Sequence, residues 1–233
     1  AVIQGNDQLR QRVAFALSEI LVISDQTGLG NYKNGLANYY DILIRNSFGN
    51  YRSLLEEVTL SPMMGLYLSM LANKKPNPAQ NTRPDENYAR EVMQLFTIGL
   101  YELNLDGTYK LDANGNTIPT YTQQTIEAFA HIYTGWTYAG ADNFQWPTNR
   151  DTINPMGVWV KNAFEEFHDF SAQTLLNNEV LPANTKAKDG LKIALDNIFN
   201  HANMGPFISK QLIQRLITSN PSPAYVERVA KVF

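Results

Sequence analysis

The sequence predicts a mainly helical, bundle-like globular domain that carries a small β-hairpin insert. Apolar residues recur at helical spacing over most of the chain, and an Asp-Gly and an Asn-Gly pair fall within a single stretch. The 233 residues, of which 44% are hydrophobic and 18% charged, are enough to bury a sizeable core. Because no internal repeat or heptad interrupts this pattern, we expect a single domain over residues 1–233.

The first third of the chain is expected to form four helices. Apolar side chains return every three or four residues, and Asn6 and Asp7 offer a cap for the first helix. Gly49 ends the second helix. Ser61-Pro62 starts the fourth, because Ser suits an N-cap and Pro suits the first helical position. The expected helices cover residues 7–23, 32–48, 51–60 and 63–71.

A polar loop, a two-faced helix and a hairpin are expected next. Residues 73–84 contain three prolines and almost nothing to bury, which predicts an exposed loop. The segment RPDENYAREVMQLFTIGL, residues 83–100, predicts a helix with one broad apolar stripe. Asp106-Gly107 and Asn114-Gly115 then lie between short β-leaning runs, so we expect a two- or three-stranded hairpin insert over residues 103–121.

The second half of the chain returns to helices after an aromatic loop. Thr122 is expected to cap a helix that runs to about Thr134. Residues 135–167 are rich in aromatic residues, Pro and Gly, and predict a loop that ends in a candidate strand from Val158. Further helices are expected over residues 171–176, from Asp189, over 207–218 and after Ser222-Pro223.

Charge and composition exclude several classes of partner and chemistry. The net charge is −3, and no Lys/Arg run exceeds Lys74-Lys75, so nucleic acids and anionic membranes are not expected partners. No apolar run approaches the roughly 20 residues of a transmembrane segment, and no signal-peptide pattern opens the chain. The absence of cysteine excludes disulfides and thiolate nucleophiles. Ala1 is not a Met and Phe233 falls inside an expected helix, which together predict a fragment of a longer protein.

The polar face of the helix over residues 83–100 is the first candidate site. Glu86 and Arg90 stand four residues apart and can pair across one turn, while Asn87 and Glu91 lie on the same polar face. One interpretation is a solvated helix surface, which is the usual location of such charges. The other is a cleft in which Glu91 acts as a base and Arg90 clamps a carboxylate or phosphate.

The histidines supply the second group of candidates. Glu165 and His168 have the i, i+3 spacing of a di-iron ligand pair, but no second pair exists, which disfavours that centre. His168 with Asp169 then remains either a pair near a cleft or a core histidine satisfied by hydrogen bonds. Glu127 and His131 also have metal-compatible spacing, but without a third ligand a local surface pair is favoured. The H-E-x-x-H, G-x-S-x-G and P-loop signatures are absent.

Two further features each have a structural and a functional interpretation. Asp112, Asn114 and Asn116 alternate as in a calcium loop, but Thr117 and Gln123 stand where Gly and Glu are needed, so a hairpin turn is favoured. Several aromatic side chains could form a platform for a sugar ring or pin their loop to the core. These residues are Tyr133, Trp136, Tyr138, Phe144 and Trp146.

Several sequence blocks resemble a known bacterial family, the domain of unknown function 1800 (DUF1800). The similarity runs from about Asn6 to Phe233, in the order of the family. It implies a mainly helical protein of several hundred residues, frequently exported and often encoded beside another exported family, with this chain as its middle part. Its acid-Asn-Tyr-Ala-Arg-Glu motif falls on Glu86 to Glu91 and its His-Asp segment on His168 and Asp169, whereas Gln173 replaces an expected Lys. The blocks are NDQLRQRVAFALSEILVIS, PDENYAREVMQLFTIGLYELN, YTQQTIEAFAHIYTGWTY, FHDFSAQTLL and PFISKQLIQRLITSNPSPAYVERVAKVF.

Two functional hypotheses follow from these observations. The favoured one is a non-catalytic module at the cell surface or in the periplasm, in which a buried polar network includes Arg90. Its aromatic loop, with Trp136 and Trp146, would meet a glycan, another exported protein or other segments of the same precursor. The alternative is a hydrolase-like or metal-assisted enzyme with no identified metal or cofactor. Its catalytic residues would be Glu86, Arg90, Glu91, His168 and Asp169, with Asn87 in binding.

Overall fold

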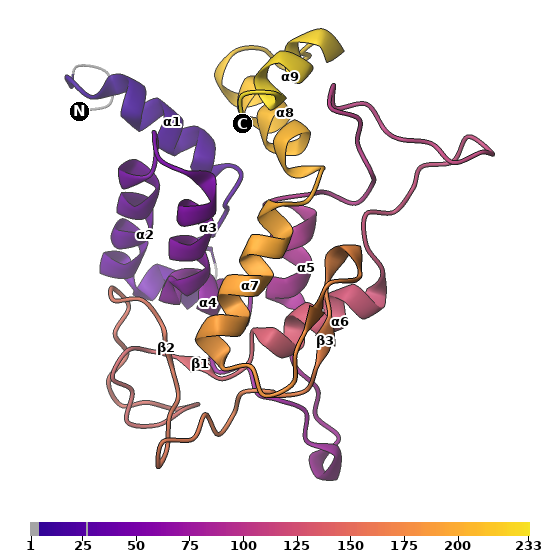
Figure 1. Cartoon of the computed structure of the whole chain (residues 1–233). Coiled ribbons are helices and arrows are strands. Elements are labelled where there is room, and N and C mark those ends of the chain that lie inside the picture. Colours follow the sequence, from indigo (N-terminus) through magenta and orange to yellow (C-terminus); the bar gives the residue numbers. More distant parts are fainter. Residues whose placement is uncertain (1–4, 27) are drawn as a thin grey trace.

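The computed structural model describes residues 5–26 and 28–233, and helices form most of this part of the chain (Figure 1). The expected mainly helical fold is confirmed. Ser61 and Ser222 cap helices that begin with Pro, and Thr122 caps another, as predicted. The α-helices are α1 (Gln8–Ser18), α2 (Lys33–Arg45), α3 (Tyr51–Leu60), α4 (Pro62–Tyr67), α5 (Asn87–Gln94), α6 (Gln123–Ile132), α7 (Ala187–Phe199), α8 (Met204–Leu216) and α9 (Pro223–Ala230).

Helix α7 lies between the two halves of the molecule. It packs against α3 on one side and α6 on the other, and α8 contacts α1 (Figure 1). One continuous apolar cluster runs through α1 to α8 and includes the fully buried Leu55, Met93, Phe129 and Leu195. The C-terminal helices therefore complete the core that the N-terminal helices begin. Within the described residues, no helix is long and apolar enough to cross a bilayer.

The strands of the structure are short. β1 (Trp136–Thr137) pairs antiparallel with β2 (Gly157–Val158), and β3 (Gln173–Thr174) pairs antiparallel with β4 (Val180–Leu181). The candidate strand over residues 158–167 is therefore wrong except at its first residue. Short 3-10 turns occur at Gly28–Asn31, Pro78–Gln80 and Leu176–Asn178.

The expected helix over residues 171–176 is also wrong, because this segment forms the first strand of a hairpin. The Leu175 N–H donates to the Glu179 carbonyl at 2.7 Å and closes the turn between β3 and β4. Asn177 and Asn178 in that turn have φ of 57° and 58°, a left-handed conformation that Asn tolerates better than most residues. Two consecutive Asn residues were therefore a turn signal that outweighed the apolar pattern.

Helices α1 and α5 end earlier than their apolar patterns predict. α5 stops at Gln94, where the Ile98 and Gly99 N–H groups both donate to the Met93 carbonyl. Gly99 has a φ of +74°, which closes the helix in a C-terminal turn. Thr97, in the turn that follows α5, is buried and donates its hydroxyl to the Val92 carbonyl.

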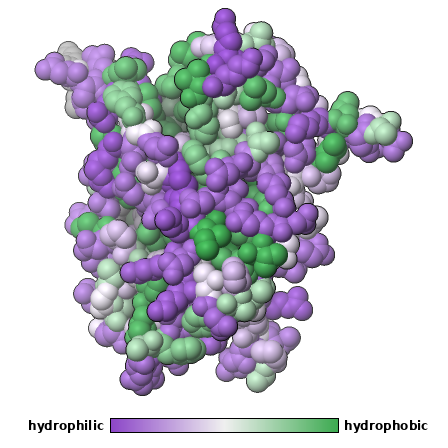
Figure 2. Space-filling model, in the orientation of Figure 1, coloured by the Kyte–Doolittle hydropathy of each residue, from purple (hydrophilic) through white to green (hydrophobic). Residues whose placement is uncertain are grey.

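Residues 101–119 form an arm that projects from the helical body on the right of Figure 1. Three antiparallel bridges hold it, namely Tyr101 to Pro119, Leu103 to Tyr109 and Leu111 to Thr117. The arm is the expected hairpin insert, with its turns at the two predicted Gly positions. Asp112 accepts hydrogen bonds from the N–H groups of Asn114 and Asn116, so this carboxylate shapes the turn. Figure 2 shows hydrophobic residues on the arm's surface.

Candidate functional site

The last turn of α6 places His131 against Asp169. The His131 Nδ1 and Asp169 Oδ2 atoms lie 2.5 Å apart, and both side chains are partly accessible. The contact joins residues 38 positions apart in sequence. Thr134 sets the geometry, because its hydroxyl donates to the His131 carbonyl at 2.6 Å and accepts from the Asp169 N–H at 2.9 Å. One threonine thus positions both the helix end and the aspartate.

Asp169 is held in its ionised form. Its Oδ1 accepts two hydrogen bonds of 2.7 Å, from the hydroxyl and the N–H of Ser171. Burial acts to raise the pKa of Asp169, but the hydrogen bonds from His131 and Ser171 outweigh burial and hold it well below its usual range. An ionised carboxylate can only accept, so we assign the shared proton to His131 Nδ1. In a neutral imidazole with its proton on Nδ1, Nε2 is the nitrogen that carries the lone pair.

His131 forms part of the wall of a polar pocket of about 380 Å³. The pocket lies between the loop that precedes α5, the start of α5 and the last two turns of α6. Two carboxylates and one guanidinium share it with the imidazole, and prolines supply most of the apolar wall. Its lining residues are Pro76, Arg83, Pro84, Glu86, Glu127, Ala130 and His131.

A glutamine connects the two carboxylates of this pocket. Glu86 Oε2 accepts from Arg90 at 2.9 Å and from Gln123 Nε2 at 2.9 Å, and the same Nε2 lies 3.3 Å from Glu127 Oε1. Arg83 is exposed and makes no hydrogen bond or ion pair with any other described residue. Its guanidinium is therefore available to an anionic ligand.

The remaining predicted residues of α5 do not join this pocket. Arg90 forms the expected pair with Glu86, but the two side chains are 38% and 32% exposed, so no buried network surrounds them. Asn87 is exposed. Glu91 lies outside the pocket wall, and its Oε2 is buried without a hydrogen-bond partner. Burial raises the pKa of Glu91, and the charge of Arg90 lowers it to a smaller extent.

His168 belongs to the core. The side chain is 1% exposed, with Nδ1 lying 3.1 Å from the Thr134 carbonyl and Nε2 3.3 Å from the Thr185 carbonyl. Its neighbour Asp169 faces His131, so the two adjacent residues do not act as a pair. Glu165 accepts from the Ala187 N–H at the start of α7. Across residues 5–26 and 28–233, no three acidic or imidazole side chains are grouped to hold a metal ion.

The aromatic loop is largely internal. Trp136 is 2% exposed, whereas Trp146 is 70% exposed. A ligand platform that includes Trp136 is therefore not formed, because this ring packs inside the core. The other rings of the expected platform are buried as well, namely Tyr133, Tyr138 and Phe144.

The sequence alone did not identify the central residue of the site. Glu127 and His131 had the right spacing to share a helix face, but no local signal connected His131 to Asp169. Arg83 lies in a Pro-rich loop and carried no pattern of its own. The His-Asp dipeptide drew attention to His168, although only its aspartate contacts a residue of the pocket wall, His131.

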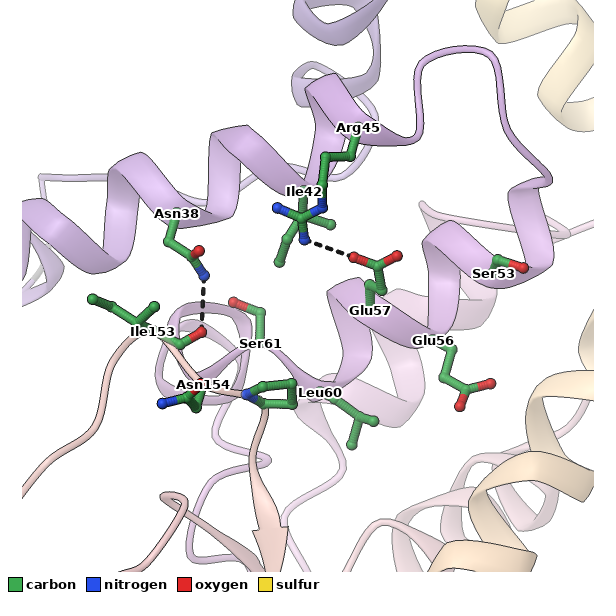
Figure 3. Close-up of a pocket in the computed structure, with 11 residues that line it drawn as sticks. Asn38, Ile42, Arg45, Ser53, Glu56, Glu57, Leu60, Ser61, Ile153 and Asn154 are labelled. Carbon is green, nitrogen blue, oxygen red and sulfur yellow. Dashed lines mark hydrogen bonds and ion pairs between the residues drawn. The ribbon is translucent and has the colours of Figure 1, made fainter.

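A second cavity, of about 510 Å³, lies between α2, α3 and residues 153–155 (Figure 3). Arg45 and Glu57 pair across it at 2.9 Å, and Asn38 donates to the Ile153 carbonyl at 2.9 Å. No histidine lines it, and its guanidinium is already paired. Of these two cavities, the smaller one beside His131 therefore combines carboxylates with an imidazole.

These contacts define a mainly helical domain with a polar pocket built on a histidine–aspartate pair. The family model described as "Protein of unknown function (DUF1800)" matches residues 1–233, and the chain belongs to this family. The resemblance found in the sequence blocks is thereby confirmed at the level of the family. No curated protein and no solved structure matches the chain.

Proposed function

We propose that the pocket beside His131 is an acid–base site of a hydrolase-like enzyme. The observation that carries this proposal is the 2.5 Å contact between His131 Nδ1 and Asp169 Oδ2 at the wall of a polar pocket. A carboxylate that accepts from Nδ1 fixes the ring and its tautomer, which leaves Nε2 to accept a proton. His131 is the proposed proton-transfer residue, and Asp169 is its positioning residue.

The other charged residues have complementary roles in this proposal. Glu86 and Glu127 lie on the same pocket wall and supply a second proton acceptor or donor for a water or hydroxyl group. Arg83 has no hydrogen-bond or ion-pair partner among the described residues and is placed to attract an anionic group of the substrate. The chemistry of the lining supports cleavage of a polar substrate by water, with His131 removing the proton from the attacking water.

Model substrates and four variants test this assignment. Purified protein would be assayed with chromogenic esters, phosphate esters, glycosides and peptide amides between pH 5 and pH 9. We expect His131→Asn and Asp169→Asn each to lower turnover at least 100-fold, as for loss of a general base or its positioning carboxylate. Glu86→Gln is expected to lower turnover, whereas Glu57→Gln, the same change in the other cavity, leaves it unchanged.

Folding of each variant would be checked by circular dichroism and thermal melting. Activity that persists in both His131→Asn and Asp169→Asn would contradict the proposal. Loss of activity in Glu57→Gln would contradict it too, and would place the active site in the cavity between α2 and α3. A wild-type protein that turns over none of the four classes would also count against an acid–base site.

We propose as a second candidate an exported, non-catalytic interaction module, part of a longer protein. The projecting arm favours it, because Tyr109 and Leu111 are both 57% exposed there. The expectation of export and of an exported partner rests on the family resemblance. Pull-down from the native source with intact protein and with the arm variant Leu111→Ser would test it, and identical partners for both would contradict an interaction through the arm.

A further inference from the structure

The arm and α8 enclose a groove of about 490 Å³ that is separate from the pocket beside His131. Its base is fixed by Asn203, whose side-chain amide accepts from the Leu103 N–H at 2.9 Å and donates to the Ile98 and Tyr101 carbonyls at 2.8 Å. The turn of the arm at Gly107 rests on α8 and α9, near Lys210 and Val226. The groove is therefore held open by contacts of the fold itself.

Two tyrosines give this groove an aromatic wall. Tyr101 and Tyr109 are 39% and 57% exposed, and their rings lie 5.7 Å apart at 84°. This edge-to-face arrangement forms a corner with accessible ring surface. Exposed tyrosines of this kind offer an apolar face to a ligand at little cost in side-chain entropy.

Three glutamines supply polar groups along the same groove. The Gln94 side chain makes no hydrogen bond to any other described residue. Gln211 and Gln214 use Nε2 to donate to the Leu95 and Ser219 carbonyls, and neither Oε1 accepts a hydrogen bond from another described residue. Amide side chains both donate and accept, so they match hydroxyl groups, which do the same.

From these contacts we propose that the groove binds a carbohydrate chain. A sugar ring presents an apolar face to Tyr101 or Tyr109 and hydroxyl groups to the three glutamines. Among the described residues no carboxylate lines the groove, so the carboxylate pair used by most glycoside hydrolases is not part of it, and we expect binding without cleavage. Lys210 is the one charged side chain in the lining and adds affinity for acidic sugar units.

A proline-rich peptide is the main competing ligand for an aromatic groove. Such peptides present carbonyl acceptors and lie between aromatic rings that form successive ridges. Tyr101 and Tyr109 instead meet edge to face, and the free Oε1 atoms of Gln211 and Gln214 need donors. Proline offers no N–H group to satisfy them. The lining thus fits hydroxyl groups better than a polyproline helix.

Affinity electrophoresis tests the proposal on the intact chain. Native gels would contain hydroxyethylcellulose or xylan as neutral polymers, and alginate or polygalacturonate as acidic ones. We expect retardation by at least one polymer, with at least tenfold weaker affinity in Tyr101→Ala and Tyr109→Ala. Gln94→Ala, which has no internal partner to lose, is expected to weaken binding without affecting folding. Lys210→Met is expected to weaken binding to acidic polymers only.

The matched control is Trp146→Ala, which removes another exposed aromatic ring far from the groove in sequence and outside its lining. This variant is expected to bind like wild type. Loss of binding in Trp146→Ala with retention in both tyrosine variants would overturn the proposal and place a sugar site on the aromatic loop. Absence of retardation by all four polymers, or binding of a proline-rich decapeptide in their place, would also overturn it. Hydrolysis is not measured here, so the outcome is independent of the acid–base site.

Discussion

His168 and Asp169 are adjacent in the chain but serve different parts of the molecule. The ring of His168 contacts two backbone carbonyls in the core, and the carboxylate of Asp169 contacts His131 in an accessible pocket. Both residues were identified as candidates from the sequence. Both residues are positioned by Thr134, which lies 34 and 35 positions earlier in the chain. Its carbonyl contacts the His168 ring, and its hydroxyl accepts from the Asp169 N–H. Contacts over such distances cannot be derived from spacing on one helix or strand.

Glu91 provides a prediction about stability and pH. Its Oε2 is buried without a partner, and burial raises the pKa of Glu91 more than the charge of Arg90 lowers it. Tyr121, which interacts electrostatically with Glu91, is neutral near pH 7, and burial raises its pKa further, to about 12. A carboxyl group with a raised folded pKa binds protons more tightly in the folded state. Its cost to stability is fully present above the folded pKa and disappears as the pH falls to the unfolded value of about 4.3.

We therefore expect Glu91→Gln to raise the melting temperature at pH 7 to 8, and the gain to vanish near pH 4. Thermal melts of both proteins across this range would measure it. Glu57→Gln is the control, because it removes a carboxylate that is paired with Arg45 and should not stabilise the protein at neutral pH. A difference that stays constant with pH would contradict the explanation, as would a loss of stability in Glu91→Gln at pH 7.

At the scale of elements, helix starts were more predictable than helix ends. Ser61-Pro62 and Thr122 are local signals, and the helices begin where these residues place them. The end of α5 depends on Gly99, which was not recognised as a C-terminal signal because apolar residues continue beyond Gln94. The hairpin insert was predictable for the opposite reason, since its Asp-Gly and Asn-Gly turns are encoded within a few residues.

Gly99 and Gly115 form a matched pair that separates two effects of adding a side chain. Both have positive φ, of +74° and +83°. A Cβ at Gly115 meets no atom within 4 Å, whereas one at Gly99 lies 2.6 Å from the ring of Phe207. Gly115→Ala is expected to cost about 1 kcal/mol in backbone strain, and Gly99→Ala about 2 kcal/mol more, because packing is disturbed as well.

Urea denaturation of the two glycine variants would measure these costs. Equal losses of unfolding free energy would show that the contact with Phe207 does not constrain the end of α5. Gly99→Ala should also disturb the groove, since Gly99 and Phe207 both line it. The arm variant Gly115→Ala leaves the groove unaltered, which makes it the control for carbohydrate binding too.

At the scale of the whole molecule, an arginine of α3 joins this helix to the central helix α7. Arg52 on α3 contacts Asp196 on α7 at 2.7 Å and Glu56 at 2.8 Å, and its side chain is only 13% exposed. A buried network was expected at Arg90 instead, but this side chain is more exposed and pairs within one helical turn. The pattern of the sequence predicted the helices and their apolar faces, but which arginine joins distant helices depends on their packing.

We expect Arg52→Met to lower the free energy of unfolding by about 2 kcal/mol, because it leaves Asp196 without its partner and disrupts the contact between α3 and α7. Arg90→Met, the same change at an accessible pair, is expected to cost less than about 1 kcal/mol. Chemical denaturation of the two variants measures both values. A larger loss of unfolding free energy for Arg90→Met than for Arg52→Met would instead support the buried polar network first expected around Arg90.

The three hydrogen bonds of Asn203 determine how the arm is attached to the helical body. The Leu103 N–H and the Ile98 and Tyr101 carbonyls, at the base of the arm, are all hydrogen-bonded to the fully buried side chain of Asn203, next to the start of α8. These three hydrogen bonds fix the backbone at the base relative to α8. The base of the arm is thereby joined to α8, which itself packs against α1 and α9. The direction in which the arm leaves the helical body is therefore set at its base, by the side chain of Asn203.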